Sequence, residues 1–224
     1  MEKRIVVAID GPAGAGKSTI ARGLAAKLDF IYIDTGAMYR AVALWALRLE
    51  IPFHDMHRLE QLALAAEIRF TPGRSQVFLN EEDVTDAIRT PEISAAASKV
   101  SATGGVRRAL VEKQREMAAT ASVVMEGRDI GTVVFPNAQV KVFLDADQSE
   151  RARRRVDQSG GDQEETEREI RDRDHRDRSR AESPLVQAAD AAYVDTTGLS
   201  PEEVEQAILK IVRERTSNGK EVTS

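Results

Sequence analysis

The feature that most constrains this chain is a glycine-rich octapeptide near its N-terminus. Residues 11–18, Gly-Pro-Ala-Gly-Ala-Gly-Lys-Ser, match the pattern G-x-x-x-x-G-K-[ST]. An apolar run, Ile5 to Ile9, precedes them, and residues 18–28 carry apolar side chains at helical spacing. A strand, a glycine turn and a helix start direct successive backbone N–H groups toward an anion. The pattern predicts a phosphate-binding loop; the alternative is a close-packed turn that binds nothing.

Two side chains of this loop have expected chemical roles. Lys17 would place its charge on the β- and γ-phosphates of a nucleotide, and the Ser18 hydroxyl can hold Mg²⁺. The residues expected to bind the nucleotide are Gly11, Pro12, Ala13, Gly14, Ala15, Gly16, Lys17, Ser18 and Thr19.

The composition limits the class of protein. The 224 residues suffice for one α/β core with a small insertion. The net charge of −5 gives no basic field for nucleic acid or a membrane surface, and the absence of cysteine excludes disulfides and thiolate metal sites. The densest later apolar run, Ala41 to Leu47, is far shorter than the ~20 residues that span a bilayer. We expect a soluble, cytoplasmic protein, monomeric, with no nucleic-acid or membrane partner.

Five short apolar runs predict buried parallel strands separated by helices. The runs are Ile5–Ile9, Phe30–Ile33, Val123–Met125, Val140–Leu144 and Ala192–Val194. The acids that follow them are Asp10, Asp34, Glu126, Asp145 and Asp195. This alternation predicts an α/β fold with a five-stranded parallel sheet and helices on both faces. Ligands of such sheets bind beyond the carboxyl ends of the strands, so we expect the acids at the ligand edge, although any single one can be a turn or cap residue.

Two segments break the α/β alternation. Residues 68–101 show short alternating patterns and a Pro72-Gly73 turn, which predict a small antiparallel sheet inserted into the main fold. Residues 151–180 hold ten arginines and nine acids, with Gly160-Gly161 in the middle. Such a segment cannot bury itself firmly, so we interpret it as a mobile helical lid over a triphosphate. A solvated helical hairpin without a ligand is the alternative.

Three further clusters carry groups that suit phosphate chemistry. Residues 35–40 follow the second strand with a hydroxyl, a tyrosine ring and a guanidinium, and residues 126–131 follow the third strand with glycine, Arg128 and Asp129. Arg173, Asp177 and Arg180 fall on one face of a predicted helix. They can form a surface ion-pair ladder or clamp phosphate groups. With the phosphate loop, these clusters predict a second anion site held by Arg40 and Arg128.

Together these motifs resemble the bacterial cytidylate (CMP/dCMP) kinases over nearly the whole chain. The resemblance is carried by residues 11–18, by Asp-Thr-Gly-Ala-Met-Tyr-Arg at 34–40, by Glu-Gly-Arg-Asp-Ile-Gly-Thr at 126–132 and by Arg-Asp-Arg-Ser-Arg at 176–180. It implies a P-loop three-layer fold with a small antiparallel NMP-binding insert and a helical lid. The implied bounds are 1–66, 102–150 and 181–224 for the core, about 67–101 for the insert and about 151–180 for the lid.

The resemblance also implies roles for single residues. Catalysis would rest on Lys17, Arg128 and Arg180. Thr35, Tyr39, Arg40, Arg128 and Arg180 would lie near the CMP phosphate; Ser98, Arg107 and Asp129 would recognise cytosine; Arg173 and Asp177 would hold the sugar. The edge of cytosine supports this, because Asp129 can accept from the N4 amino group while the other two donate. A salt bridge that only orients Arg128 is the alternative role of Asp129.

We therefore expect an enzyme that uses Mg²⁺ and ATP to phosphorylate CMP or dCMP. Two alternatives remain at this point. One is a kinase for another small acceptor, such as UMP. The other is a regulatory module that binds ATP without catalysis, in which Arg40, Arg128 and Arg180 would have no second anion to bind. Sequence alone does not decide which of Arg151, Arg154 and Arg155 contacts ATP.

Overall fold

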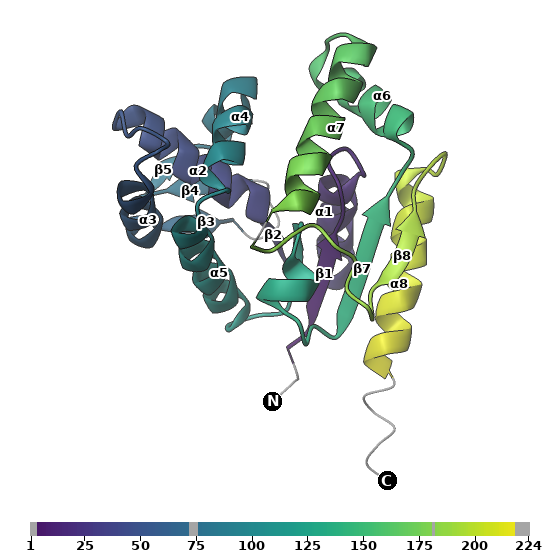
Figure 1. Ribbon diagram of the computed structural model, residues 1–224. Helices are drawn as coiled ribbons and strands as arrows, with labels where there is room; N and C mark the ends of the chain where they lie inside the picture. Colours follow the sequence, from purple (N-terminus) through teal and green to yellow (C-terminus); the bar gives the residue numbers. More distant parts are fainter. Residues whose placement is uncertain (1–3, 72–75, 181, 218–224) are drawn as a thin grey trace. The chain divides into compact units, whose positions relative to one another are not determined.

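A computed structural model describes residues 4–71, 76–180 and 182–217 of the chain. The described residues form two compact units (Figure 1). The first contains those up to Phe30 and those from Ser122 onward, and the second is the continuous segment Ile31–Ala121.

A parallel β-sheet forms the centre of the first unit. Its strands are β1 (Val6–Asp10), β6 (Val123–Gly127), β7 (Val140–Asp145) and β8 (Ala192–Asp195). β1 pairs with β6 on one side and with β7 on the other, and β7 pairs with β8. With β2 (Ile31–Asp34) the complete order is β2-β6-β1-β7-β8, which confirms the predicted five-stranded parallel sheet.

Helices α1 (Lys17–Leu28) and α8 (Pro201–Ser217) pack against each other, α1 also against β6 and α8 also against β7. The start of α8 follows from its sequence. Ser200 and Glu203 exchange hydrogen bonds, from Ser200 N to Glu203 Oε2 at 2.8 Å and from Glu203 N to Ser200 Oγ at 3.3 Å. This capping box satisfies N–H groups that an α-helix leaves without partners at its first turn.

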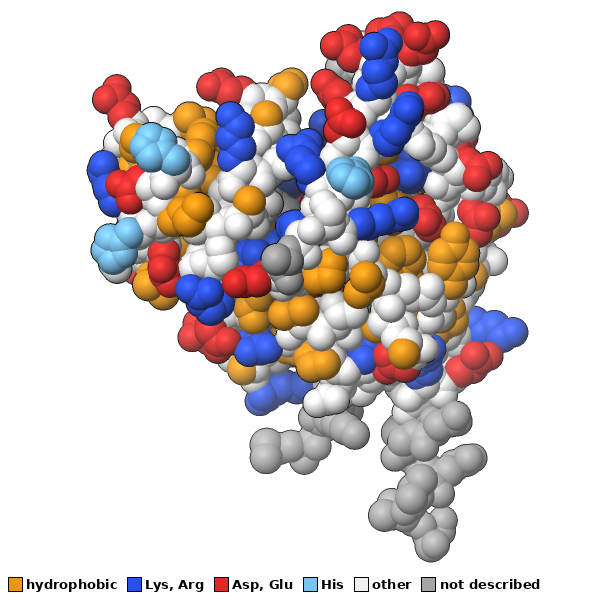
Figure 2. All heavy atoms as spheres, in the orientation of Figure 1, with side chains coloured by type: hydrophobic (Ala, Val, Ile, Leu, Met, Phe, Trp, Pro, Cys, Tyr) orange, Lys and Arg blue, Asp and Glu red, His pale blue; other side chains and the backbone are white. Residues whose placement is uncertain are grey.

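Two highly charged helices form a hairpin in the first unit. They are α6 (Gln148–Ser159) and α7 (Gln163–Ser179), which pack together. The turn between them places Gly160 and Gly161 at φ 70° and 112°, values that few side chains tolerate. Figure 2 shows acidic and basic side chains mixed over the upper end of this hairpin. The predicted helical hairpin is confirmed, while its action as a lid stays a prediction.

The second unit contains the predicted small antiparallel sheet. Its strands, in the order β3-β4-β5, are β3 (Ile68–Phe70), β4 (Val77–Leu79) and β5 (Glu82–Asp83). The predicted Pro72-Gly73 turn lies outside the described residues. The other elements of the unit are α2 (Thr35–Arg48), α3 (Met56–Ala65), the short helix η1 (Ala87–Arg89), α4 (Pro91–Val100) and α5 (Gly104–Ala118).

Helix α4 corrects the expectation that residues 68–101 are all sheet and turn. The Thr90 hydroxyl accepts the backbone N–H of Ile93 at 3.2 Å, and Pro91 occupies the first helical position. Both are helix-start signals, and Ile93, Ala97 and Val100 then form a buried stripe. The narrower bounds predicted for insert, lid and core stay predictions. Among the described residues, no helix has the length and apolarity needed to cross a bilayer.

Candidate active site

The glycine-rich loop joins β1 to α1 as predicted. Gly11 lies so close to β7 that a Cβ there would overlap the Leu144 carbonyl oxygen. Gly14 has φ +79°, in the left-handed region that disfavours side chains. No side chain caps the first N–H groups of α1, whose N-cap residue is Gly16. The loop thus offers backbone donors at the positive end of α1, the arrangement in which proteins bind phosphate.

Lys17 is buried at the start of α1, and its ammonium donates to the Pro12 carbonyl at 2.6 Å. Burial is the largest cause that lowers its pKa to about 7; the charge of Arg128 acts in the same direction, whereas Glu126 acts in the opposite direction. Arg173 is a third cation that acts on it. The sequence-predicted Lys17, Arg128 and Arg173 therefore lie in one positive region, and an anion there would stabilise all three charges.

An ion-pair cluster links the turn after β6 to α7. Arg128 Nε and Asp177 Oδ2 are 2.9 Å apart, and Arg180 Nη2 lies 3.7 Å from Asp177 Oδ1. Burial alone would raise the pKa of Asp177, but Arg128, Arg180 and Arg173 outweigh that effect and hold it below its usual range. All four belong to the predicted substrate-binding set, so the cluster brings them together within the first unit.

Asp10, the acid at the end of β1, has a structural partner that the sequence did not reveal. Its two carboxylate oxygens accept the backbone N–H groups of Ile130 at 2.8 Å and Gly131 at 2.7 Å. These residues begin η2 (Ile130–Val134), a π-helical turn directly after Asp129. Burial raises the pKa of Asp10 to about 6, although both amide hydrogen bonds favour the carboxylate. Asp10 therefore holds the Arg128–Asp129 turn beside the phosphate loop.

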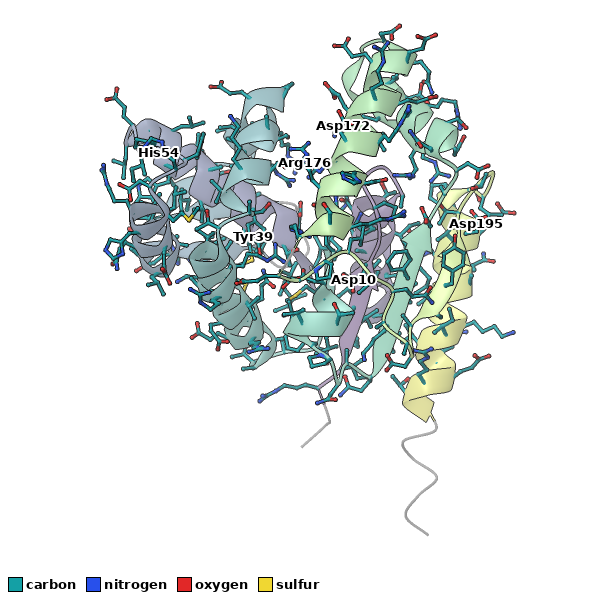
Figure 3. All side chains as sticks on the ribbon, viewed as in Figure 1. Asp10, Tyr39, His54, Asp172, Arg176 and Asp195 are labelled. Atoms are coloured by element: carbon teal, nitrogen blue, oxygen red, sulfur yellow. The ribbon has the colours of Figure 1, made fainter. Side chains whose placement is uncertain are left out.

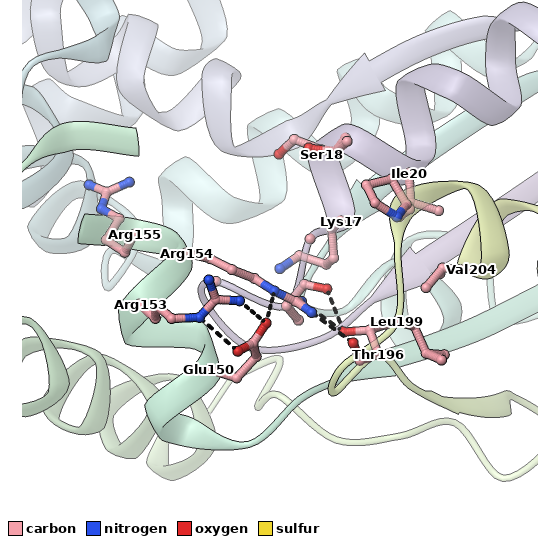
Figure 4. A pocket seen from close by; sticks show the side chains of 15 residues that line it. Lys17, Ser18, Ile20, Glu150, Arg153, Arg154, Arg155, Thr196, Leu199 and Val204 are labelled. Carbon is pink, nitrogen blue, oxygen red and sulfur yellow. Dashed lines mark hydrogen bonds and ion pairs between the residues drawn. The ribbon is translucent and has the colours of Figure 1, made fainter. Parts of the chain in front are cut away.

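A cavity of about 430 Å³ opens beside the phosphate loop (Figure 4). Its size is within the range of small-molecule sites. It is lined by the loop and the start of α1, by the arginines of α6 and by the segment after β8. The lining residues are Gly14, Ala15, Gly16, Lys17, Ser18, Thr19, Ile20, Glu150, Arg153, Arg154, Arg155, Thr196, Leu199, Pro201 and Val204.

Arg154 is fixed in the wall of this cavity. Its guanidinium donates to the Thr196 hydroxyl at 2.9 Å, to the Thr196 carbonyl at 2.7 Å and to Glu150 Oε1 at 3.0 Å. Arg154 and Arg155 line the cavity, whereas Arg151 is buried elsewhere at the base of α6. Thr196 and Leu199 were missed from the sequence, although Thr196 directly follows Asp195, the acid that ends β8 (Figure 3).

The remaining predicted substrate residues lie in the second unit. Asp34 caps α2 by accepting the Ala37 N–H at 2.9 Å, and its other oxygen accepts Arg40 Nη2 at 2.8 Å. Thr35 is buried in the first turn of α2. Arg107, on α5, is buried, and its Cζ lies 5.8 Å from the ring centroid of Tyr39.

Arg107 has a second contact within the same unit. Arg107 also donates to the Ser101 carbonyl at 3.3 Å, and Ser98 lies one turn earlier on α4. The second unit thus gathers Thr35, Tyr39, Arg40, Ser98 and Arg107 on α2, α4 and α5.

Comparison with known proteins identifies the family. Residues 7–214 match the family model described as cytidylate kinase. A cytidylate kinase of Solibacter usitatus (strain Ellin6076) is 62% identical over 227 residues, covering 98% of this chain and 97% of the relative. A cytidylate kinase of Listeria innocua is 47% identical over 224 residues, covering 97% of this chain and all (100%) of the relative.

Two solved structures share the fold of this chain. A gluconokinase from Sinorhizobium meliloti aligns with a TM-score of 0.51 at 15% identity, covering 98% of this chain and 99% of that chain. An uncharacterized protein from Eubacterium ventriosum aligns with a TM-score of 0.56 at 14% identity, covering 95% of this chain and 99% of that chain. These likenesses support the α/β fold alone. The family model and the two relatives together establish that this chain belongs to the cytidylate kinase family.

Proposed function

We propose that this protein transfers the γ-phosphoryl group of ATP to the phosphate of CMP or dCMP, releasing ADP and CDP or dCDP. The observation that carries the proposal is the positive region around Lys17, Arg128 and Arg173, in a chain that belongs to the cytidylate kinase family. Phosphoryl transfer requires cations on the transferring oxygens more than it requires covalent catalysis. The predicted catalytic residues Lys17, Arg128 and Arg180 supply such cations.

The donor nucleotide would occupy the cavity beside the phosphate loop. The backbone donors at the start of α1 would bind the ATP phosphates, and Lys17 would exchange its bond to Pro12 for one to a phosphate. The apolar side of the cavity, at Leu199 and Val204, suits a flat base, and Arg154 gives that base a cationic edge. Of the three arginines that the sequence left open, we assign Arg154 and Arg155 to ATP.

The residues around the loop fit Mg²⁺ bound mainly through ATP. Ser18 lies in the first turn of α1 and lines the cavity, so its hydroxyl can be a direct ligand. Both oxygens of Asp10 accept backbone N–H groups, so the contacts of this acid hold the turn after β6. No cluster of three or more His, Cys, Asp or Glu suited to a metal occurs in the described part of the chain. When bound, Mg²⁺ neutralises charge on the β- and γ-phosphates.

On the first unit, the acceptor phosphate would be bound by the cations that surround Asp177. The attacking atom is a phosphate oxygen of CMP, which is ionised at neutral pH because a phosphate monoester has its second pKa near ~6. This oxygen forms a bond to the γ-phosphorus as the bond from that phosphorus to the ADP oxygen breaks. No side chain has to remove a proton. Arg128 and Arg180 would hold the acceptor phosphate, with Asp177 between them keeping both cations in register.

Two further parts of the proposal concern the state and place of the enzyme. We propose that the enzyme is a monomer, as expected from the sequence. Because ATP and nucleoside monophosphates are cytoplasmic metabolites, we also propose a cytoplasmic location.

The decisive experiment measures ADP release from Mg²⁺-ATP with CMP, dCMP, UMP, AMP and GMP in parallel. Turnover with CMP and dCMP well above the other acceptors is the expected result. Equal or faster turnover with UMP would instead assign the enzyme to another pyrimidine acceptor. Tight ATP binding, measured by calorimetry, without turnover on any acceptor would favour the regulatory module.

A further inference from the structure

Both helices of the charged hairpin are anchored to the phosphate loop by one buried ion pair. Arg151, on α6, donates from Nη1 to Asp174 Oδ2 on α7 at 2.5 Å. The same Nη1 donates to the Ala13 carbonyl of the loop at 3.0 Å, and Nε donates to the Ala146 carbonyl at 3.0 Å. Asp145 lies farther away, 3.9 Å from Nε.

The ion pair binds both backbone polar groups of Ala13, its N–H and its carbonyl. Asp174 Oδ1 accepts the Ala13 N–H at 3.4 Å, while Arg151 binds the Ala13 carbonyl. A Cβ on Gly14 would lie 2.9 Å from both the Cβ and the carbonyl oxygen of Arg151. The root of α6 thus packs directly on the loop, and only glycine fits at position 14.

Stability alone explains this arrangement poorly. Arg151 and Asp174 are 6% and 7% exposed, so two charges have been taken out of water. Desolvation cancels most of the attraction in such pairs, and apolar residues of similar volume are often at least as stabilising. The pair does, however, fix the rotation of α7 about its axis. Arg173 is the adjacent residue and Asp177 lies three positions later, so both depend on that rotation.

We propose that Asp174 is a positioning residue that, through Arg151 and Ala13, couples occupation of the phosphate loop to the placement of Arg173 and Asp177. A nucleotide in the loop shifts Ala13, and α7 follows because Asp174 binds the N–H of that residue directly and its carbonyl through Arg151. Binding of ATP then favours binding of CMP, and thermodynamic linkage requires the reverse effect to be equally large. The proposal rests on the proposed function, since it assigns the acceptor to residues on α7.

The test compares Asp174→Asn with Asp172→Asn. Asp172 lies on the same helix and is exposed (Figure 3), so its variant loses the same charge without touching the anchor. Calorimetry gives the Kd of CMP with and without saturating Mg²⁺-AMP-PNP, a non-hydrolysable ATP analogue. We expect AMP-PNP to tighten CMP binding about tenfold in the wild type and in Asp172→Asn, a coupling of typical size. In Asp174→Asn the ratio should fall below about twofold while AMP-PNP still binds.

A second variant separates coupling from folding. Arg151→Met/Asp174→Leu replaces the ion pair by apolar side chains, which we expect to keep the protein folded. It should show the same loss of coupling as Asp174→Asn. Amide exchange of α7 supplies an independent readout, because AMP-PNP alone should slow it in the wild type and in Asp172→Asn but in neither anchor variant.

Three outcomes would overturn the proposal. The first is that AMP-PNP leaves the Kd of CMP unchanged in the wild type. The second is that AMP-PNP tightens CMP binding in the folded double variant as much as in the wild type, and the third is that Asp172→Asn loses this tightening as fully as Asp174→Asn. None of them depends on turnover. If CMP does not bind the wild type at all, the proposed function fails, and the exchange experiment with AMP-PNP still tests the anchor by itself.

Discussion

Arg128 Nε lies 2.9 Å from Asp177 Oδ2, so a cation from the turn after β6 and an acid from α7 meet in a largely buried ion pair. Arg180, the residue directly after α7, approaches the same carboxylate. The acid therefore holds two of the predicted phosphate-binding cations at a fixed spacing.

Asp177→Asn should raise the KM for CMP by at least about tenfold, because the amide keeps the shape but releases both arginines. A charged hydrogen bond of this kind contributes roughly 1.5–3 kcal/mol. Steady-state kinetics with CMP varied at saturating ATP measures the effect. Asp172→Asn is the matched control. Unchanged CMP kinetics in Asp177→Asn would show that the ion pair has no role in binding the acceptor.

Binding of the ATP analogue should take up protons at pH 8, because burial lowers the pKa of Lys17 to about 7 in the protein without nucleotide. Phosphate oxygens favour the charged ammonium, so the pKa rises on binding and about one proton enters per site. Calorimetry at pH 8 in two buffers with different ionisation heats measures this uptake. At pH 6 the uptake by Lys17 should be close to zero, since the ammonium is already charged.

Lys17→Met provides the control for that experiment. The variant should bind without the proton uptake and should lose at least about 100-fold in turnover, the usual cost of removing a charge from the transition state. Proton uptake that persists in Lys17→Met belongs to another group and contradicts the assignment.

The base of the acceptor should be read through Asp129, which is buried. Uracil presents a carbonyl where cytosine presents the N4 amino group. With UMP bound, this carbonyl and the Asp129 carboxylate would be two acceptors facing each other, at a cost on the order of 1–3 kcal/mol. We expect kcat/KM for CMP to exceed that for UMP by at least about tenfold. Asp129→Asn should narrow this gap mainly by losing CMP activity. An equal fractional loss for both substrates would leave only the salt-bridge role with Arg128.

Asp10→Asn should change stability in a way that depends on pH. Burial raises the pKa of Asp10 from 3.8 to about 6 on folding. A raised folded-state pKa means that its stabilising contribution is present below about pH 4 and is lost as the pH rises through about 6. The free energy of unfolding of Asp10→Asn, minus that of the wild type, should therefore increase as the pH is raised from 4.5 to 7.5, by an amount on the order of 3 kcal/mol at most. Urea unfolding at the two pH values measures the difference, with Asp172→Asn as control; parallel curves would rule out the buried carboxylate as the source.

Arg154→Ala should weaken the binding of ATP without affecting the binding of CMP. The substitution removes the two hydrogen bonds to Thr196 and one wall of the donor cavity. The contact that we propose between Arg154 and ATP is a charged hydrogen bond of ordinary strength, so its loss should raise the KM for ATP by about tenfold or more. Arg168→Ala, an exposed change on α7 outside the cavity, serves as control. A larger increase in the KM for CMP than in the KM for ATP would contradict the assignment of Arg154 to ATP.

The parts of the fold that were predictable depend on local sequence. The phosphate loop, the five parallel strands and the start of α8 each have a signal within a few residues, and the structure matches them within about two residues. Helix α4 was mistaken for part of the sheet although Thr90 and Pro91 carry a helix-start signal. The alternating apolar pattern of the short strands ends before these residues, but the predicted sheet segment was extended past them to residue 101.

The parts that escaped prediction depend on tertiary contacts. Asp10 meets Ile130 and Gly131 across 120 residues of sequence, and Arg151 meets Ala13 across 138. An acid or an arginine looks the same in the sequence whether it faces solvent, a ligand or a distant peptide group. Composition identified residues 151–180 as charged, but it could not show that one ion pair among them is buried at the phosphate loop.

The position of β1 has a consequence for how the chain is made. This strand leaves the ribosome among the first, yet its neighbours β6 and β7 lie more than a hundred residues later, as the Val6–Val123 and Val7–Val140 pairings show. At a synthesis rate of about 5–20 residues per second, β1 waits on the order of ten seconds with both edges exposed. The continuous segment Ile31–Ala121 emerges complete in the meantime. Truncated or stalled chains that end before β6 therefore present an apolar, unpaired strand to other nascent chains, which makes them substrates for chaperones and prone to aggregation.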